Sequence, residues 1–133
     1  MTKKNMKLAG YAVTGLFSAM MLFGGLMQLA AQDQVLAVFH RLLIDNTMTI
    51  RFLGLMKIAG AVGMWMPKGR TWAVHGFTFL FCGALVTHLG AADPAPEFIG
   101  ATVGLCLLGA SEWLAKQTRK SSSGSSARGR KAA

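Results

Sequence analysis

Three polar side chains interrupt otherwise apolar runs of this sequence, and they are the first candidates for a functional site. Gln28, Lys57 and His88 each lie near one end of such a run. A polar group placed in lipid costs free energy, so these positions are functional candidates by default. If each run crosses a membrane, the three side chains lie at similar depths and can line one polar pocket between helices. The alternative is that Lys57 snorkels to water, because helical side chains lean toward the N-terminus.

A second polar contact is expected at the opposite ends of two of these runs. His75 and Glu112 each lie about four residues from a helix end. They can touch if their helices are neighbours, which would make an inner polar pair. Glu112 can instead pair with Lys116 on its own helix, at the i, i+4 spacing. Of these two interpretations we favour the local pair.

The other reactive residue types do not form a recognisable catalytic set. The three histidines lack the spacing of metal ligands, and no nucleophile–base pair or phosphate loop is evident. Cys82 and Cys106 fall at matching depths, about 12 Å from one interface at the rise of a helix. A disulfide also needs Cα atoms closer than about 7 Å, which matching depth does not guarantee. We predict two buried free thiols, no metal site and no catalytic activity by this chain alone.

Composition places these residues in a membrane protein. The chain has 133 residues, of which 53% are hydrophobic and 14% charged, with a net charge of +9. Soluble domains carry about 25% charged residues. Intrinsic disorder of most of the chain and a disulfide-stapled scaffold are excluded, because hydrophobicity is high and only two cysteines are present. One domain is the limit at this length.

Four apolar runs are long enough to cross a bilayer as helices. The first is longer than the apolar region of about 7–15 residues found in a cleaved signal peptide. We therefore predict an all-α, integral membrane four-helix bundle over residues 8–116. Its expected spans are residues 8–31, 47–66, 71–90 and 98–115.

The segments outside these spans are polar. Residues 1–7 are basic, and residues 117–133 form a tail rich in Ser, Gly and Arg that we expect to be disordered. Residues 32–46 are predicted to form a short amphipathic helix, either at the membrane surface or packed on the bundle. The apolar positions of this helix are Val35, Val38, Phe39, Leu42 and Leu43.

The distribution of positive charge predicts the orientation of the bundle. With four spans, both termini and the loop between the second and third spans share one side. Segments rich in Lys and Arg stay in the cytoplasm, so we expect both termini there. That side carries Lys3, Lys4, Lys7, Lys68, Arg70, Lys116, Arg119, Lys120, Arg128, Arg130 and Lys131, against Arg41 and Arg51 on the other.

Aromatic residues agree with this orientation, since Tyr11, Trp65, Trp72 and Trp113 all fall at the cytoplasmic ends of their spans. Gln28, Lys57 and His88 then belong to the outer leaflet. The basic tail is better explained by contact with anionic lipid than by nucleic-acid binding.

Three short motifs resemble those of the DoxX-like family of small membrane proteins. They are Arg51-Phe-Leu-Gly54 with Ile58-Ala-Gly60-Ala61 and Pro67, then Cys82-Gly-Ala-Leu-Val-Thr-His88, and Gly24-Gly-Leu-Met-Gln28-Leu29. The resemblance covers most of residues 8–115 and implies a four-helix membrane bundle. In the family a Lys often stands at Gln28 and a Glu at Lys57. The embedded Lys–Glu pair is therefore absent here, and Lys57 can instead reach Asp33 or Asp93.

The resemblance also suggests a range of functions. Members include a membrane subunit associated with a thiosulfate:quinone oxidoreductase, and a distantly similar vertebrate protein is a receptor chaperone. Our leading hypothesis is a non-catalytic accessory or anchoring subunit in the bacterial inner (plasma) membrane, in a redox or quinone-linked setting. The alternatives are a quinone-binding oxidoreductase subunit and a small-solute transporter or channel component. The expected partners are the lipid bilayer and either another membrane protein or a second copy of the chain. No cofactor is predicted, and a quinone is the one cofactor that the alternative hypotheses leave open.

Overall fold

The computed structural model is helical throughout its regular structure, over the residues that it describes, which are 2–42, 44–91 and 95–130. This confirms the all-α fold class. The helices are α1 (Lys3–Leu29), α2 (Asp33–Arg41), α3 (Thr47–Gly63), α4 (Gly69–Gly90) and α5 (Ala95–Arg130). The short helix expected between the first two spans is therefore present as α2. Leu43, one of its predicted apolar positions, lies outside the described residues.

Local sequence signals explain where these helices begin and end. The Thr2 hydroxyl accepts from the backbone N–H of Asn5 at the start of α1, and the Asn46 side chain accepts from Met48 at the start of α3. Such caps satisfy backbone donors that lack a partner in the first helical turn. Ala31, with a φ of 47°, turns the chain between α1 and α2. A left-handed residue at this place ends α1 two residues before the end of the predicted span.

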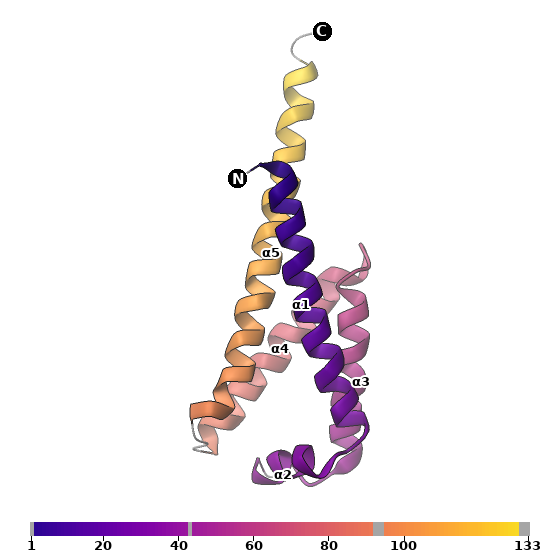
Figure 1. Ribbon diagram of the computed structural model, residues 1–133, viewed down its shortest axis with the longest axis vertical. Coiled ribbons are helices and arrows are strands. Elements are labelled where there is room, and N and C mark those ends of the chain that lie inside the picture. Colours follow the sequence, from indigo (N-terminus) through magenta and orange to yellow (C-terminus); the bar gives the residue numbers. More distant parts are fainter. Residues whose placement is uncertain (1, 43, 92–94, 131–133) are drawn as a thin grey trace.

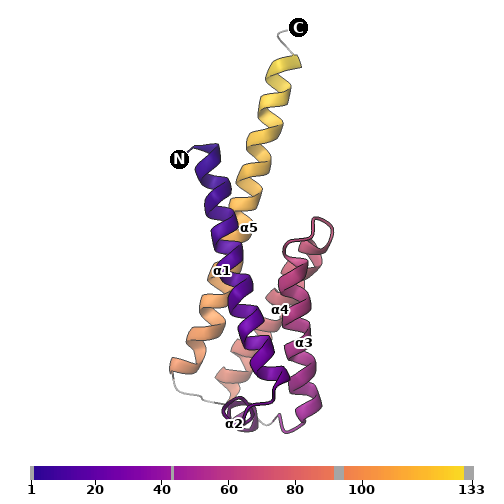
Figure 2. The ribbon, with the colours of Figure 1, turned by 45° about the vertical axis from the view of Figure 1, so that its right-hand side comes forward.

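The four long helices pack with α1 against α3 and α5, and with α4 against the same two helices (Figure 1). The start of α1, the turn between α3 and α4 and the later half of α5 lie toward one end, which we call the termini end (Figure 2). The short α2, the end of α4 and the start of α5 lie at the opposite end, which we call the α2 end.

Aromatic rings from two helices form the centre of the core. Phe17 on α1 meets Phe77 on α4 edge to face, with centroids 4.9 Å apart, and Phe81 lies one turn further along α4. The two α4 rings cover Gly60 on α3 and Gly104 on α5, where a Cβ atom would collide with them. Glycine at these positions lets α4 approach both neighbours closely.

Large apolar side chains also cover the outside of the bundle. Two helical segments, Lys4–Leu29 and Gly69–Gly90, are long and apolar enough to cross a membrane. On α4 the side chains of Trp72 and Phe79 are 82% and 83% exposed. Exposed apolar surface on this scale marks contact with lipid or with another protein.

Two features differ from the sequence-based expectations. Cys82 and Cys106 are free, as predicted, but both are exposed rather than buried, because they lie on outward faces of α4 and α5. The helix α5 continues to Arg130, where we expected disorder from residue 117. Extending a formed helix needs no new nucleation, and residues 115–120 include the good helix formers Ala, Lys, Gln and Arg, whereas the Ser and Gly of residues 121–130 do not favour helix.

Candidate functional site

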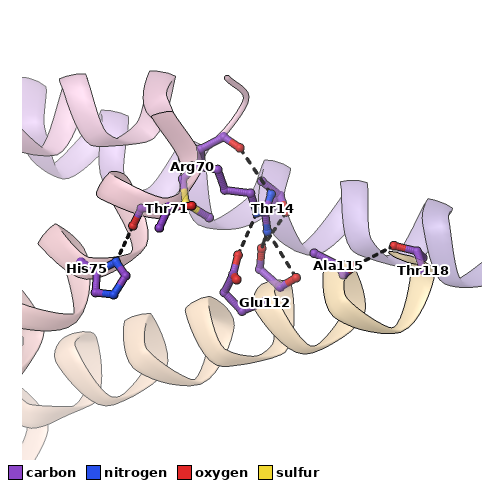
Figure 3. A network of polar contacts seen from close by, with 9 residues as sticks. Thr14, Arg70, Thr71, His75, Glu112, Ala115 and Thr118 are labelled. Atoms are coloured by element: carbon purple, nitrogen blue, oxygen red, sulfur yellow. Dashed lines mark hydrogen bonds and ion pairs between the residues drawn. The ribbon is translucent and has the colours of Figure 1, made fainter. Parts of the chain in front are cut away.

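Arg70, in the first turn of α4, is the centre of a polar network at the termini end (Figure 3). Its Nε donates to Oε1 of Glu112 on α5 at 2.7 Å. Its Nη2 donates to the Ser111 hydroxyl at 2.7 Å and to the Ser111 carbonyl at 3.3 Å. Its Nη1 donates to the carbonyl of Met64, just after α3, at 3.3 Å. One guanidinium therefore ties α4 to α5 and to the end of α3, which uses its planar fork of donors.

Helix α1 joins this network through two hydroxyl groups. Thr14 and Ser111 lie 2.8 Å apart through their side-chain oxygens, and both residues are buried. The Ser18 hydroxyl accepts from the indole N–H of Trp65 at 3.0 Å. Trp65 also stacks on Tyr11, with ring centroids 6.3 Å apart. Buried polar groups in an apolar bundle need such partners, and these contacts join α1 to α5 and to the turn after α3.

The structure corrects the expected inner polar pair. Glu112 is bound to Arg70, and neither His75 nor Lys116 is its partner. His75 is exposed and donates through Nδ1 to the carbonyl of Thr71, one turn earlier in α4, at 2.7 Å. A guanidinium is always charged and binds a carboxylate more strongly than a neutral imidazole does, so Arg70 is the favoured partner. Arg70 was expected only as one of the positive charges on the cytoplasmic side of the bundle.

A pocket of about 310 Å³ opens beside this network. It lies between the start of α1, the α3–α4 turn and the later half of α5. The charged residues in its lining are all cations: Lys7, Arg70 and Arg119. Tyr11, Trp65 and Ser111 contribute to the same lining. The sequence signal for this pocket was present as cations at matching ends of three expected spans, but it was used only to predict orientation.

The α2 end holds the residues that we expected to form the outer-leaflet pocket. Gln28 on α1 is only 6% exposed, and its Oε1 atom has no hydrogen-bond partner among the residues that the structure describes. It lies where α1 and α3 cross with their backbones almost in contact. A Cβ atom added to Gly54 would lie 2.6 Å from the carbonyl oxygen of Gly25 and 2.9 Å from the Gln28 Cβ.

Lys57 belongs to the same crossing. A Cβ atom added to Gly25 would lie 3.4 Å from the Lys57 Cβ, and Lys57 is half-buried on α3. Gln28 and Lys57 therefore both lie at the place where α1 and α3 cross. His88 is buried near the end of α4. A single pocket shared by all three side chains stays a prediction, and Asp93, one suggested partner of Lys57, lies outside the described residues.

Within the part of the chain that the structure describes, no group of three or more His, Cys, Asp or Glu side chains could hold a metal ion. The fold and the polar network define a small apolar helical bundle whose buried polar groups hold helices together. The model of the DoxX-like family matches residues 12–111, so the chain belongs to the DoxX-like family. The match confirms the resemblance seen in the motifs, and it spans most of α1 through Ser111. No curated protein and no solved structure matches the sequence.

Proposed function

We propose that this DoxX-like membrane protein is a non-catalytic accessory subunit, which spans the bacterial inner membrane four times and anchors or assists a partner protein. The observation that carries the proposal is how the chain uses its polar and apolar groups. Buried hydroxyls and the Arg70–Glu112 pair bind one another across helices, which stabilises the bundle. The outer faces of the helices instead expose large apolar side chains, which suit lipid and a membrane-embedded partner.

Exposed apolar side chains on α3 and α5 support the four-span arrangement. Phe52 and Val62 on α3 are more than half exposed, as are Ile99 and Trp113 on α5. These helices therefore present the same kind of surface as α1 and α4. A bundle with this surface on every long helix is stable in lipid and unfavourable in water. The excess of Lys and Arg at the termini end supports a cytoplasmic location for that end.

The orientation is tested by labelling single cysteines in intact cells. The native thiols are first replaced with serine, at Cys82 and Cys106. One variant then carries Gln34→Cys in α2, and a second carries Gly124→Cys near the end of α5. We expect a membrane-impermeant reagent to label position 34 before lysis and position 124 only after lysis. Labelling of position 124 in intact cells would show that the termini lie outside the cytoplasm, which is the opposite of the proposed orientation.

The accessory role is tested by purification in a gentle detergent, with mass spectrometry of the bound proteins and lipids. We expect a stoichiometric protein partner to copurify with the wild-type chain. Lys57→Met should keep the helical content but lose this partner, because it removes a charge at the α1–α3 crossing while preserving chain length. Arg51→Met, on the exposed surface of the same helix, is the matched control and should keep the partner. A Lys57→Met protein that inserts better and loses nothing would show that Lys57 merely snorkels.

A second candidate function, a quinone-binding oxidoreductase subunit, is favoured by one observation. The Oε1 of Gln28 is a buried acceptor for which the described residues supply no donor, and a quinol hydroxyl is a donor of suitable chemistry. Quinone recovered with the wild-type chain, and lost from a Gln28→Met variant, would favour this function over the accessory role.

A further inference from the structure

We propose that the pocket at the termini end binds a phosphate group, with the headgroup of an anionic phospholipid or soluble phosphate as its source. This inference goes beyond the accessory role, since it requires only the pocket and not a protein partner. The pocket is about 310 Å³ in volume, within the range of small-ligand sites.

The positive charges around the pocket are only partly compensated by acidic side chains. Of the three cations in its lining, Arg70 is neutralised by its ion pair with Glu112, at 2.7 Å. Lys7 and Arg119 have no acidic partner among the residues that the structure describes. Two positive charges from opposite walls, α1 and α5, therefore face one open space. A dianionic or monoanionic phosphate group would compensate them.

Among the acidic side chains that the structure describes, none competes for these cations. Asp33 begins α2 and Asp45 lies between α2 and α3, at the α2 end of the bundle. Glu112 is not part of the pocket lining, and its carboxylate is already bound by Arg70. The cations at the rim therefore remain available to a ligand from outside the chain.

The lining of the pocket combines aromatic rings with cationic side chains. Tyr11 and Trp65 stack on each other beside the cations. Such rings lie at the level of lipid headgroups when they flank a membrane span. Basic pockets between helices on the cytoplasmic side are suited to anionic headgroups, since anionic lipids concentrate in that leaflet. The pocket thus offers cations at the depth where a lipid phosphate lies.

The test measures lipid binding by native mass spectrometry of the full chain in detergent. The probes are dioleoylphosphatidylglycerol, which is anionic, and dioleoylphosphatidylcholine, which has no net charge. The pocket variant is Lys7→Gln with Arg119→Gln. The matched control is Lys4→Gln with Lys116→Gln, which removes the same charge from the same two helices outside the pocket lining. Circular dichroism checks that both variants keep the wild-type helical content.

We expect the pocket variant to lose about 25-fold in affinity for phosphatidylglycerol, since each of the two cations near a headgroup contributes about a factor of five. The control should stay within about twofold of wild type, because its cations lie outside the pocket. Equal losses in the two variants, or no loss in either, would overturn the proposal. Phosphatidylcholine bound as tightly as phosphatidylglycerol would overturn it too.

A competition arm then identifies the source of the phosphate group. Inorganic phosphate is added in excess to the wild-type chain loaded with phosphatidylglycerol. Displacement that is weakened in the pocket variant supports a site for soluble phosphate. Retention of the lipid in excess phosphate, together with the loss of about 25-fold in the variant, supports the lipid headgroup.

Discussion

The two ends of this bundle treat buried polar groups in opposite ways. At the termini end, Thr14, Ser111 and Arg70 are joined into one network, and every pair in it crosses between helices. At the α2 end, the buried Oε1 of Gln28 has no partner within the described part of the chain, although α1 and α3 approach closely there. One end gains stability from its polar groups, while the other carries the cost of an unpaired acceptor, about 1–3 kcal/mol.

The difference separates structural polar groups from candidate binding groups. A network that satisfies its own members holds helices in one arrangement and leaves nothing for a ligand to complete. An unpaired acceptor is available to a partner that brings a donor. Among the charged residues that line the pocket at the termini end, Lys7 and Arg119 have no acidic partner within the described residues, and they suit an anion. The four predictions that follow test this contrast, beginning with the largest expected effect.

The largest loss of stability is expected when the guanidinium of Arg70 is removed from the network at the termini end. Arg70→Met leaves the Glu112 carboxylate without its ion pair, although the two side chains are only 18% and 26% exposed. We expect a loss of about 2–3 kcal/mol in the free energy of unfolding, measured by denaturant titration in detergent. Arg51→Met, on the exposed face of α3, is the control. Replacing Arg70 and Glu112 together with Met should recover part of the loss, and no recovery would mean that the pair is not the cause.

At the α2 end, backbone contact rather than hydrogen bonding should dominate. Gly54→Ala places a Cβ atom 2.6 Å from the Gly25 carbonyl oxygen, so α1 and α3 must separate. The expected cost is about 1–3 kcal/mol in the same titration. Gly76→Ala, on α4, meets nothing within 4 Å and should be neutral or stabilising, because alanine favours helix. Similar destabilisation by both substitutions would contradict close packing at the crossing.

Removal of a buried polar group should raise the stability of the protein at the α2 end and lower it at the termini end. Gln28→Met deletes the unpaired acceptor with little change in shape, and we expect a gain of about 1 kcal/mol in stability. Thr14→Val deletes a partner of Ser111, and we expect a loss of about 1 kcal/mol. Thermal unfolding in the same detergent measures both. A destabilising Gln28→Met substitution would show that the amide has a partner after all.

The smallest effect is expected in the turn that leads into α2. Ala31 adopts a φ of 47°, which costs about 1–2 kcal/mol for a residue with a Cβ atom. Glycine removes this cost but adds about 0.5–1 kcal/mol of conformational entropy to the unfolded chain. Ala31→Gly should therefore stabilise the protein by about 0.5 kcal/mol. A destabilising effect would mean that the left-handed turn is not adopted.

The helices themselves follow from local properties of the sequence. The apolar runs predict the long helices, and the caps at Thr2 and Asn46 explain where two of them begin. The short α2 follows from apolar residues at helical spacing, and the motifs around Arg51 and His88 predict the family. These signals can be recognised from the sequence alone, because hydrogen bonding within a helix and capping involve residues that are close together in the chain.

The orientation of each helix was decided only by the tertiary structure. The long helices are apolar on nearly every side, so their periodicity does not say which face packs inward. For this reason Cys82 and Cys106 were expected to be buried and are exposed. The choice of Arg70 over His75 as partner of Glu112 depends on how α4 is rotated against α5. The amino-acid sequence thus determined the helices, the charge asymmetry and the family. Packing between distant segments determined which polar groups meet, because that depends on helix rotation and crossing, which neighbouring residues do not encode.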